Sequence, residues 1–255
     1  MGVLLVLLLL TGVAPMRAQS FDHTAFDGVL RAHVVHGGVD YKALQADRGA
    51  LDMYVARLGT VSEQAFRKWP RAEQIAFLIN TYNAIVMQQV IDDYPIERSP
   101  NPAALVRPAN SVWQIDGFFN QLKHRLLGSD LTLDAIEHEW LRAKLKEPRI
   151  HFALVCAARS CPPLRAEAYR GDRLEAQLDD QARSFLNDRE RNRFGNEDAE
   201  LSEIFKWFGD DFGGEKGVRT YLGKYLNPEL ARRVQGGSYR IRYVEYDWTL
   251  NDVAR

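Results

Sequence analysis

The two cysteines, Cys156 and Cys161, are the residues best suited to chemistry, and both lie in one stretch, residues 149–164. The apolar run 150–156 predicts a buried strand, and the small residues and two prolines that follow predict a tight turn at its end. A strand that enters such a turn often carries a catalytic nucleophile. Two chemistries stay open: a disulfide across the turn, or a thiolate nucleophile at either position. The spacing is wide for zinc and no second ligand pair accompanies it, so no metal is expected.

A nucleophilic thiol needs a nearby base, because its usual pKa of about 8.5 leaves little thiolate at neutral pH. In a continuous strand His151 would point to the opposite face from Cys156 and lie roughly 17 Å from it. His138 lies on a predicted helix, residues 133–145, that must turn back to feed the strand, so His138 is the preferred base. Its neighbour Glu137 falls within the apolar stripe of this helix. A carboxylate there either pairs with an arginine or has a raised pKa and an acid–base role.

Polar side chains also occur on the longest predicted helix, residues 71–93, which is apolar nearly all round and is therefore expected to be buried. Asn80 and Asn83 lie on one side of it, three residues apart. Inside a core each amide must find hydrogen-bond partners. They either pin neighbouring loops, or one of them orients a catalytic histidine or stabilises an oxyanion.

The motif Y-D-W-T-L-N at residues 246–251 places two aromatic side chains beside an acid and an amide. It predicts either a C-terminal lid over the core or one wall of a pocket, with Asp247 as a group that orients a histidine. The residues expected to contact a ligand are Asn80, Tyr82, Cys161 and Trp248.

Composition indicates a folded, exported chain. The 255 residues are 46% hydrophobic and 26% charged, with a formal net charge of −1, which argues against a nucleic-acid partner. Residues 1–18 are predicted to be a signal peptide, because their apolar run is too short to span a membrane and is followed by a plausible cleavage site. Residues 19–255 are then expected in the periplasm or outside the cell, where disulfides persist, with no stable membrane span.

The order of elements predicts one α+β domain over residues 19–255. Most of the periodic segments are helical. Short alternating runs predict strands within residues 112–133, with a hairpin turn at Gly128-Ser129, and a closing strand at residues 239–244. We therefore expect a mostly helical domain with a small, largely antiparallel sheet.

Several of these stretches together resemble the family called domain of unknown function 547. The motifs that carry the resemblance are I-N-T-Y-N-A (79–84), L-T-L-D-A-I-E-H (131–138), A-L-V-C-A-A-R-S-C-P-P-L (153–164), L-S-E-I-F-K-W-F-G-D-D-F (201–212) and Y-D-W-T-L-N (246–251). The resemblance implies a single helical-plus-sheet domain and little about activity. Plant relatives typically keep a residue like Cys156 but not Cys161, and are similar to this chain at Glu137 and His138. That pattern favours Cys156 as the functional cysteine and His138 as its base.

Two functions remain open. The first is a cysteine-dependent hydrolase or acyl transferase, in which Cys156 attacks a carbonyl, His138 takes its proton, and Asn83 or Asp247 orients the imidazole. The second is a non-catalytic binding or scaffold domain stapled by a Cys156–Cys161 disulfide, with the aromatic end motif facing a peptide, a glycan or a small molecule. Neither function calls for a cofactor.

Overall fold

The computed structural model describes residues 20–236 and 238–253. The predicted signal peptide, residues 1–18, lies outside the described residues. None of the helices within the described part combines the length and the apolar character that a membrane span requires.

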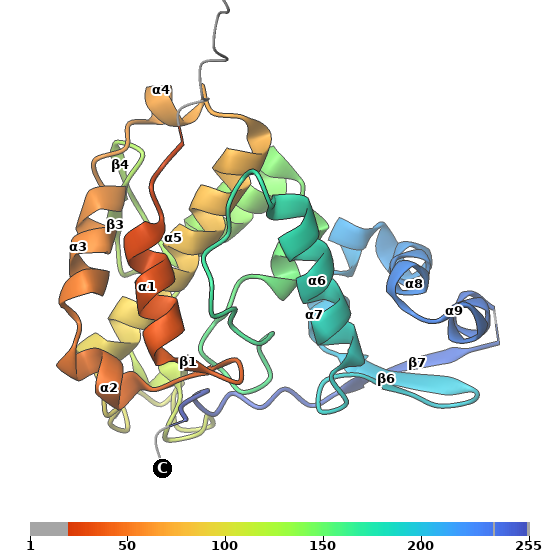
Figure 1. Cartoon of the computed structure of the whole chain (residues 1–255). Coiled ribbons are helices and arrows are strands. Elements are labelled where there is room, and N and C mark those ends of the chain that lie inside the picture. The colour runs from red at the N-terminus through yellow and green to blue at the C-terminus, as the bar shows by residue number, and fades with distance from the viewer. Residues whose placement is uncertain (1–19, 237, 254–255) are drawn as a thin grey trace, which may run out of the picture.

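Helices are the commonest regular elements of the fold (Figure 1). The α-helices are α1 Thr24–His33, α2 Tyr41–Ala46, α3 Gly49–Leu58, α4 Glu63–Phe66, α5 Arg71–Asp92, α6 Leu174–Asn187, α7 Ile204–Trp207, α8 Gly214–Tyr225 and α9 Pro228–Gln235. Helical turns of other pitch are η1 Val112–Gln114, η2 Ala135–Leu145, η3 Pro148–Phe152 and η4 Gly209–Phe212.

Within the described residues the strands are short and form three small sheets. They are β1 Val34–Val35, β2 Gly38–Val39, β3 His124–Leu126, β4 Ser129–Leu131, β5 Arg193–Phe194, β6 Asp198–Ser202 and β7 Arg240–Val244. The pairs β1–β2, β3–β4 and β5–β6 are antiparallel, and β6–β7 is parallel. The expected α+β class with a small, largely antiparallel sheet is confirmed, and so is the hairpin between β3 and β4.

Helix α5 is the centre of the core. Of its residues from Ile75 to Ile91, all but the half-buried Gln88 are buried. It packs against α2, α3, α6 and η2 (Figure 1). The sequence prediction of a long buried helix here is therefore correct to within one residue at its end, because an apolar surface nearly all round has no other stable environment.

The predicted strand at residues 150–156 is wrong. Residues from Pro148 to Phe152 form the 3₁₀ helix η3, and an irregular segment carries the chain on to Cys156. Proline is favoured at the first position of a helix, and the Glu147 side chain accepts a hydrogen bond from the Arg149 amide at its start. A short apolar run cannot distinguish a buried strand from a buried helical turn by its periodicity alone.

The helix predicted before that segment is present but is wound differently. The segment η2 is a π-helix, with about one residue more per turn than an α-helix. Glu137 and Arg142, five residues apart, therefore lie one turn apart. π-helical turns are rare, and those that occur within helices are often found at functional sites.

The last residues of the described chain return to the body of the molecule (Figure 1). Beyond β7, the carbonyls of Asp247 and Thr249 accept hydrogen bonds from the amides of Ser160 and Arg159. The Asn251 carbonyl accepts one from the amide of Val39. The C-terminal segment 246–252 is thus attached both to the turn at residues 156–161, the cysteine turn, and to the β1–β2 hairpin.

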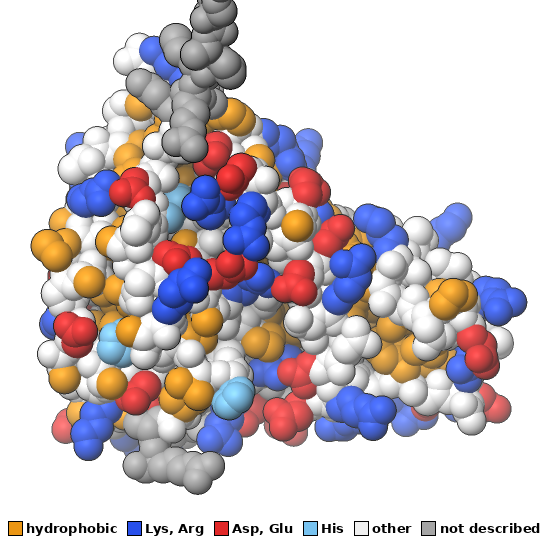
Figure 2. Space-filling model, in the orientation of Figure 1, with side chains coloured by type: hydrophobic (Ala, Val, Ile, Leu, Met, Phe, Trp, Pro, Cys, Tyr) orange, Lys and Arg blue, Asp and Glu red, His pale blue; other side chains and the backbone are white. Residues whose placement is uncertain are grey.

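Charged side chains of both signs alternate over the face formed by α1 and α6 (Figure 2). Many of them form ion pairs there, such as Arg31 with Asp27 and Arg165 with Asp180. Exposed pairs of this kind contribute little to stability, so the buried apolar core carries the fold.

Candidate functional site

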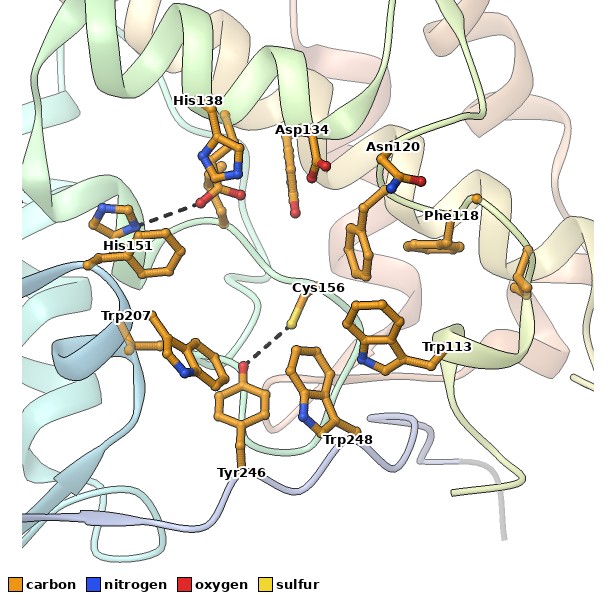
Figure 3. Close-up of a pocket in the computed structure, with 18 of the residues that line it drawn as sticks. Trp113, Phe118, Asn120, Asp134, His138, His151, Cys156, Trp207, Tyr246 and Trp248 are labelled. Carbon is orange, nitrogen blue, oxygen red and sulfur yellow. Dashed lines mark hydrogen bonds and ion pairs between the residues drawn. The ribbon is translucent and has the colours of Figure 1, made fainter. Parts of the chain in front are cut away.

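A cavity of about 410 Å³ opens beside the cysteine turn. Its walls come from α5, η2, η3, α7, the loop at residues 101–120, the cysteine turn and the C-terminal segment. Figure 3 shows Cys156 between a polar end, with Asp134, His138 and His151, and an opposite aromatic wall. A concave apolar site with a few converging polar groups is the usual form of a small-molecule site.

The aromatic wall consists of Trp113, Trp207, Tyr246 and Trp248. The rings of Trp207 and Trp248 are stacked at an angle of 22°, with their centroids 5.8 Å apart. Trp113 packs edge-on against Trp248, with a centroid distance of 5.3 Å. Trp113 and Trp207 are 37% and 41% exposed. Large aromatic side chains that stay exposed at the edge of a cavity indicate a binding surface.

The polar end is organised by His151. Its side chain is 1% exposed, its ring stacks on Phe208, and its Nε2 lies 2.7 Å from Asp211 Oδ2. Asp211 also accepts two hydrogen bonds from Arg142, at 2.6 and 3.1 Å, and its pKa is held far below the usual range by His151 and Arg142. An ionised carboxylate can only accept, so His151 Nε2 carries the hydrogen. Burial lowers the pKa of His151, which favours the neutral ring with an unprotonated Nδ1.

Glu137 faces that free nitrogen. Its Oε1 lies 3.9 Å from His151 Nδ1, beyond direct hydrogen-bond length, so both atoms can contact a ligand. Burial raises the pKa of Glu137 to about 7, against the opposing effects of Arg142 and the Tyr82 hydroxyl. The carboxyl group can therefore both give and take a proton near neutral pH.

His138 and His151 line the same cavity. His138 is exposed, and its Nδ1 lies 3.0 Å from Arg142. The partial burial of its ring and the charge of Arg142 lower its pKa. His151, which sequence reasoning set aside, is instead the histidine fixed by a carboxylate. Its exclusion depended on the strand that the structure replaces with η3.

Asp211 and Arg142 were also missed by sequence reasoning. Asp211 belongs to the resemblance motif at residues 201–212, yet nothing in its spacing indicates a histidine 60 residues earlier. Arg142 could have been found, because pairing with an arginine was one of the two alternatives expected for Glu137. Its charge does act on this carboxyl group, although the pKa of Glu137 is raised. No three His, Cys, Asp or Glu side chains of the described residues are arranged to hold a metal ion.

Of the two chemistries left open for the cysteines, the structure contains the disulfide. Cys156 and Cys161 are joined, with their Cα atoms 6.2 Å apart. Cys156 Sγ lies 3.4 Å from the Tyr246 hydroxyl inside the cavity. Neither His138 nor His151 forms a hydrogen bond with this sulfur.

The side-chain amides of Asn80 and Asn83 form hydrogen bonds with backbone groups of other segments. Asn83 donates to the Ala153 carbonyl and accepts from the Val155 amide, both at 2.9 Å. Asn80 makes the same pair of bonds with Tyr169. Neither amide is among the residues that line the cavity. Asn83 therefore fixes the path of the chain between η3 and Cys156.

Replacing Asn83 with alanine is expected to lower the free energy of unfolding by about 2 kcal/mol, because a buried carbonyl and a buried amide lose their partner. Urea titration would measure the loss. The matched control is Gln88→Ala, which removes a partly exposed amide from the same helix and is expected to cost less than about 1 kcal/mol. Equal losses of unfolding free energy in Asn83→Ala and Gln88→Ala would contradict the role of Asn83 in fixing the backbone.

Asp247 lies apart from the polar end. It is exposed, and its Oδ1 accepts a hydrogen bond from the Thr249 amide. It lines a separate hollow with residues 105–108, whereas Trp248 lines the aromatic cavity as well. Of the expected ligand contacts, Tyr82 and Trp248 line the cavity, while Asn80 and Cys161 do not.

Comparison with known proteins supports the resemblance drawn from the motifs. Residues 66–186 match the family described as "Protein of unknown function, DUF547". No curated protein and no solved structure matches the chain. The matched residues include Glu137, His151 and both cysteines, whereas Asp211 and the end motif follow them. The segment that matches this family therefore supplies the carboxyl, imidazole and sulfur groups of the cavity.

Proposed function

We propose that the protein is a hydrolase or acyl transferase that works in the aromatic cavity, with Glu137 as its proton-transfer group. The observation that carries the proposal is the pairing of a buried carboxyl of pKa about 7 with a histidine fixed by Asp211, 3.9 Å away. Strongly shifted pKa values in a cavity are typical of catalytic groups.

The geometry supports a general acid–base step. The ionised Glu137 takes a proton from water, and the water oxygen forms a bond to the acyl carbon of a substrate. The bond from that carbon to the leaving group breaks, and Glu137 returns the proton to the leaving oxygen or nitrogen. Burial lowers the pKa of His151, so its neutral Nδ1 accepts a hydrogen bond from the same water or leaving group.

The aromatic wall defines the substrate class. Trp113, Trp207 and Trp248 offer flat apolar faces on one side of the cavity, opposite the polar end with Asp134 and His138 (Figure 3). Glu137 lines the same cavity, 3.9 Å from His151. The substrate that fits is an acyl compound, ester or amide, with a flat apolar portion beside the reacting carbonyl.

A second candidate uses the sulfur. Cys156 lines the same cavity, so after reduction its thiol would face a bound substrate and could serve as the nucleophile expected from the sequence. In the oxidised protein Cys156 is bonded to Cys161 and has no thiol. The oxidised state therefore favours water as the nucleophile and Glu137 as the base.

The test is hydrolysis of p-nitrophenyl butyrate, followed by release of p-nitrophenolate. We expect turnover by the oxidised protein and a loss of at least about a hundredfold in kcat/KM in Glu137→Gln. The rate should depend on one ionisation near the pKa of Glu137, and this dependence should vanish in the variant.

The matched control is Glu139→Gln, which changes an exposed carboxylate on the same helix and is expected to leave the rate unchanged. Equal rates for the two variants, or no turnover by the unmodified protein in either redox state, would exclude the proposal. Turnover that requires tris(2-carboxyethyl)phosphine and is abolished by iodoacetamide would instead assign the reaction to Cys156.

A further inference from the structure

The two sulfurs of the disulfide have different surroundings. Cys156 is partly exposed and lines the aromatic cavity, whereas Cys161 is 1% exposed. Figure 3 shows the Cys156 sulfur pointing into the cavity beside Tyr246. A thiolate that enters the cavity therefore reaches Cys156 and not Cys161.

The buried sulfur is surrounded by donors. Cys161 Sγ accepts from the amides of Cys156 and Ala158 at 3.0 and 3.3 Å and from the Tyr246 hydroxyl at 3.4 Å. The residue between the two amides, Ala157, has a φ of 63°, in the left-handed region. Amides turned inward around such a residue form a concavity that binds anions.

These donors favour charge on Cys161. A sulfur in a disulfide is a weak acceptor, but a thiolate is an anion and forms stronger hydrogen bonds. The guanidinium of Arg191 adds a nearby positive charge, since it donates to the carbonyls of Cys161 and Arg159. Asp188 pairs with Arg191 and offsets part of this charge. The surroundings of Cys161 thus stabilise the thiolate that forms when this sulfur leaves.

We propose that the Cys156–Cys161 disulfide is an exchange-active site that oxidises a dithiol bound in the aromatic cavity. Cys156 is the sulfur that is attacked, and Cys161 is the sulfur that leaves. The substrate class is a small molecule or peptide with two thiols and an apolar or aromatic portion that fits against Trp113, Trp207 and Trp248.

The exchange balances in two steps. The first substrate thiolate forms a bond to Cys156 Sγ, the Cys156–Cys161 bond breaks, and Cys161 leaves as a thiolate. The second substrate thiol loses its proton and attacks the substrate sulfur, and Cys156 leaves and is protonated. The substrate loses two electrons and becomes a disulfide, while the protein gains them as a dithiol. A second, disulfide-bearing compound reverses these steps and restores the oxidised protein.

In the first experiment the unmodified oxidised protein is equilibrated in buffers of reduced and oxidised glutathione. The exchange is quenched with acid, free thiols are alkylated, and the protein mass is measured by mass spectrometry. We expect a measurable dithiol fraction at ratios that leave structural disulfides fully oxidised. The glutathione adduct trapped before completion should map to Cys156. A protein that stays oxidised in excess reduced glutathione, or an adduct on Cys161, would overturn the proposal.

The second experiment compares the single variants Cys161→Ser and Cys156→Ser with oxidised glutathione. We expect the remaining thiol of Cys161→Ser to form its mixed disulfide at least about ten times faster, because Cys156 faces the cavity and Cys161 is buried. Equal rates would contradict the asymmetry. Should either variant fail to fold, the measurement on the unmodified protein still decides.

A third comparison tests the donors. Tyr246→Phe removes a hydroxyl that contacts both sulfurs, so the equilibrium constant for reduction by glutathione should fall by about tenfold. Tyr239→Phe removes a hydroxyl that bonds the carbonyls of Gly195 and Asp198 and should leave the constant unchanged. A constant that is the same in both variants would overturn the role of Tyr246 in the exchange.

Discussion

Glu137→Gln is expected to gain stability relative to the unmodified protein as the pH rises, by about 3 kcal/mol between pH 4 and pH 8. The pKa of Glu137 is about 7 in the folded chain and 4.5 as the ordinary value. Between these values the folded protein keeps a proton that the unfolded chain has lost. The contribution of this group to the free energy of unfolding therefore falls as pH rises and is constant above about pH 7. Glutamine does not titrate, so the variant escapes this loss.

Urea unfolding at one-unit pH steps would measure the effect as the difference in unfolding free energy between variant and parent. The same series on Glu139→Gln is the control, because that carboxylate is exposed on the same helix. A difference that is independent of pH for Glu137→Gln would show that the folded protein holds this carboxyl group ionised.

Asp211→Ala is expected to destabilise the fold by about 3 kcal/mol at neutral pH. The substitution leaves the buried Nε2–H of His151 without its acceptor and leaves Arg142 without its carboxylate. Because the pKa of Asp211 is depressed in the folded chain, its contribution is present above the ordinary value of 3.8 and is lost as pH falls below it. The loss caused by the substitution should therefore shrink in acid.

The control for this prediction is Asp210→Ala, which removes the exposed neighbouring carboxylate and should change stability by less than about 0.5 kcal/mol. Asp211→Asn adds a second comparison, since its amide oxygen can still accept from His151. Proton NMR of the imidazole would then show whether the Nε2–H is retained. If Asp210→Ala and Asp211→Ala unfold at the same urea concentration, the hydrogen bond between His151 and Asp211 contributes nothing to the stability of the fold.

The parts of the fold that were predictable are those in which local pattern and burial agree. The apolar surface of residues 71–93 predicts helix α5, and the Gly128-Ser129 turn predicts the β3–β4 hairpin. Each of these signals lies within the segment that it describes. They required no knowledge of distant contacts.

The site was predictable only in part, for a physical reason. Glu137 was singled out because a carboxyl group in an apolar stripe must be paired or shifted, and the two cysteines because of their spacing. His151 was excluded by a strand geometry that a 3₁₀ turn replaces, and its partner Asp211 lies 60 residues away in the sequence. Contacts across such separations depend on how helices pack, which periodicity within one segment does not record.

The π-helical winding of η2 illustrates the same limit. The apolar pattern of residues 133–145 identifies a helix, but it does not specify the pitch. The wider turn affects the site, because it sets Arg142 one turn from Glu137, where its charge opposes the effect of burial on the carboxyl pKa.

The attachment of the C-terminal segment makes the cavity depend on parts of the chain that lie far apart in the sequence. Hydrogen bonds from the amides of Ser160 and Arg159 hold the segment that carries Tyr246 and Trp248 against the cysteine turn. A molecule in which this segment is undocked keeps its carboxyl group, imidazole and sulfurs, but has an open-sided hollow in place of a cavity. Ligand binding in the cavity therefore requires the segment to be docked, and a ligand that binds there stabilises the docked state.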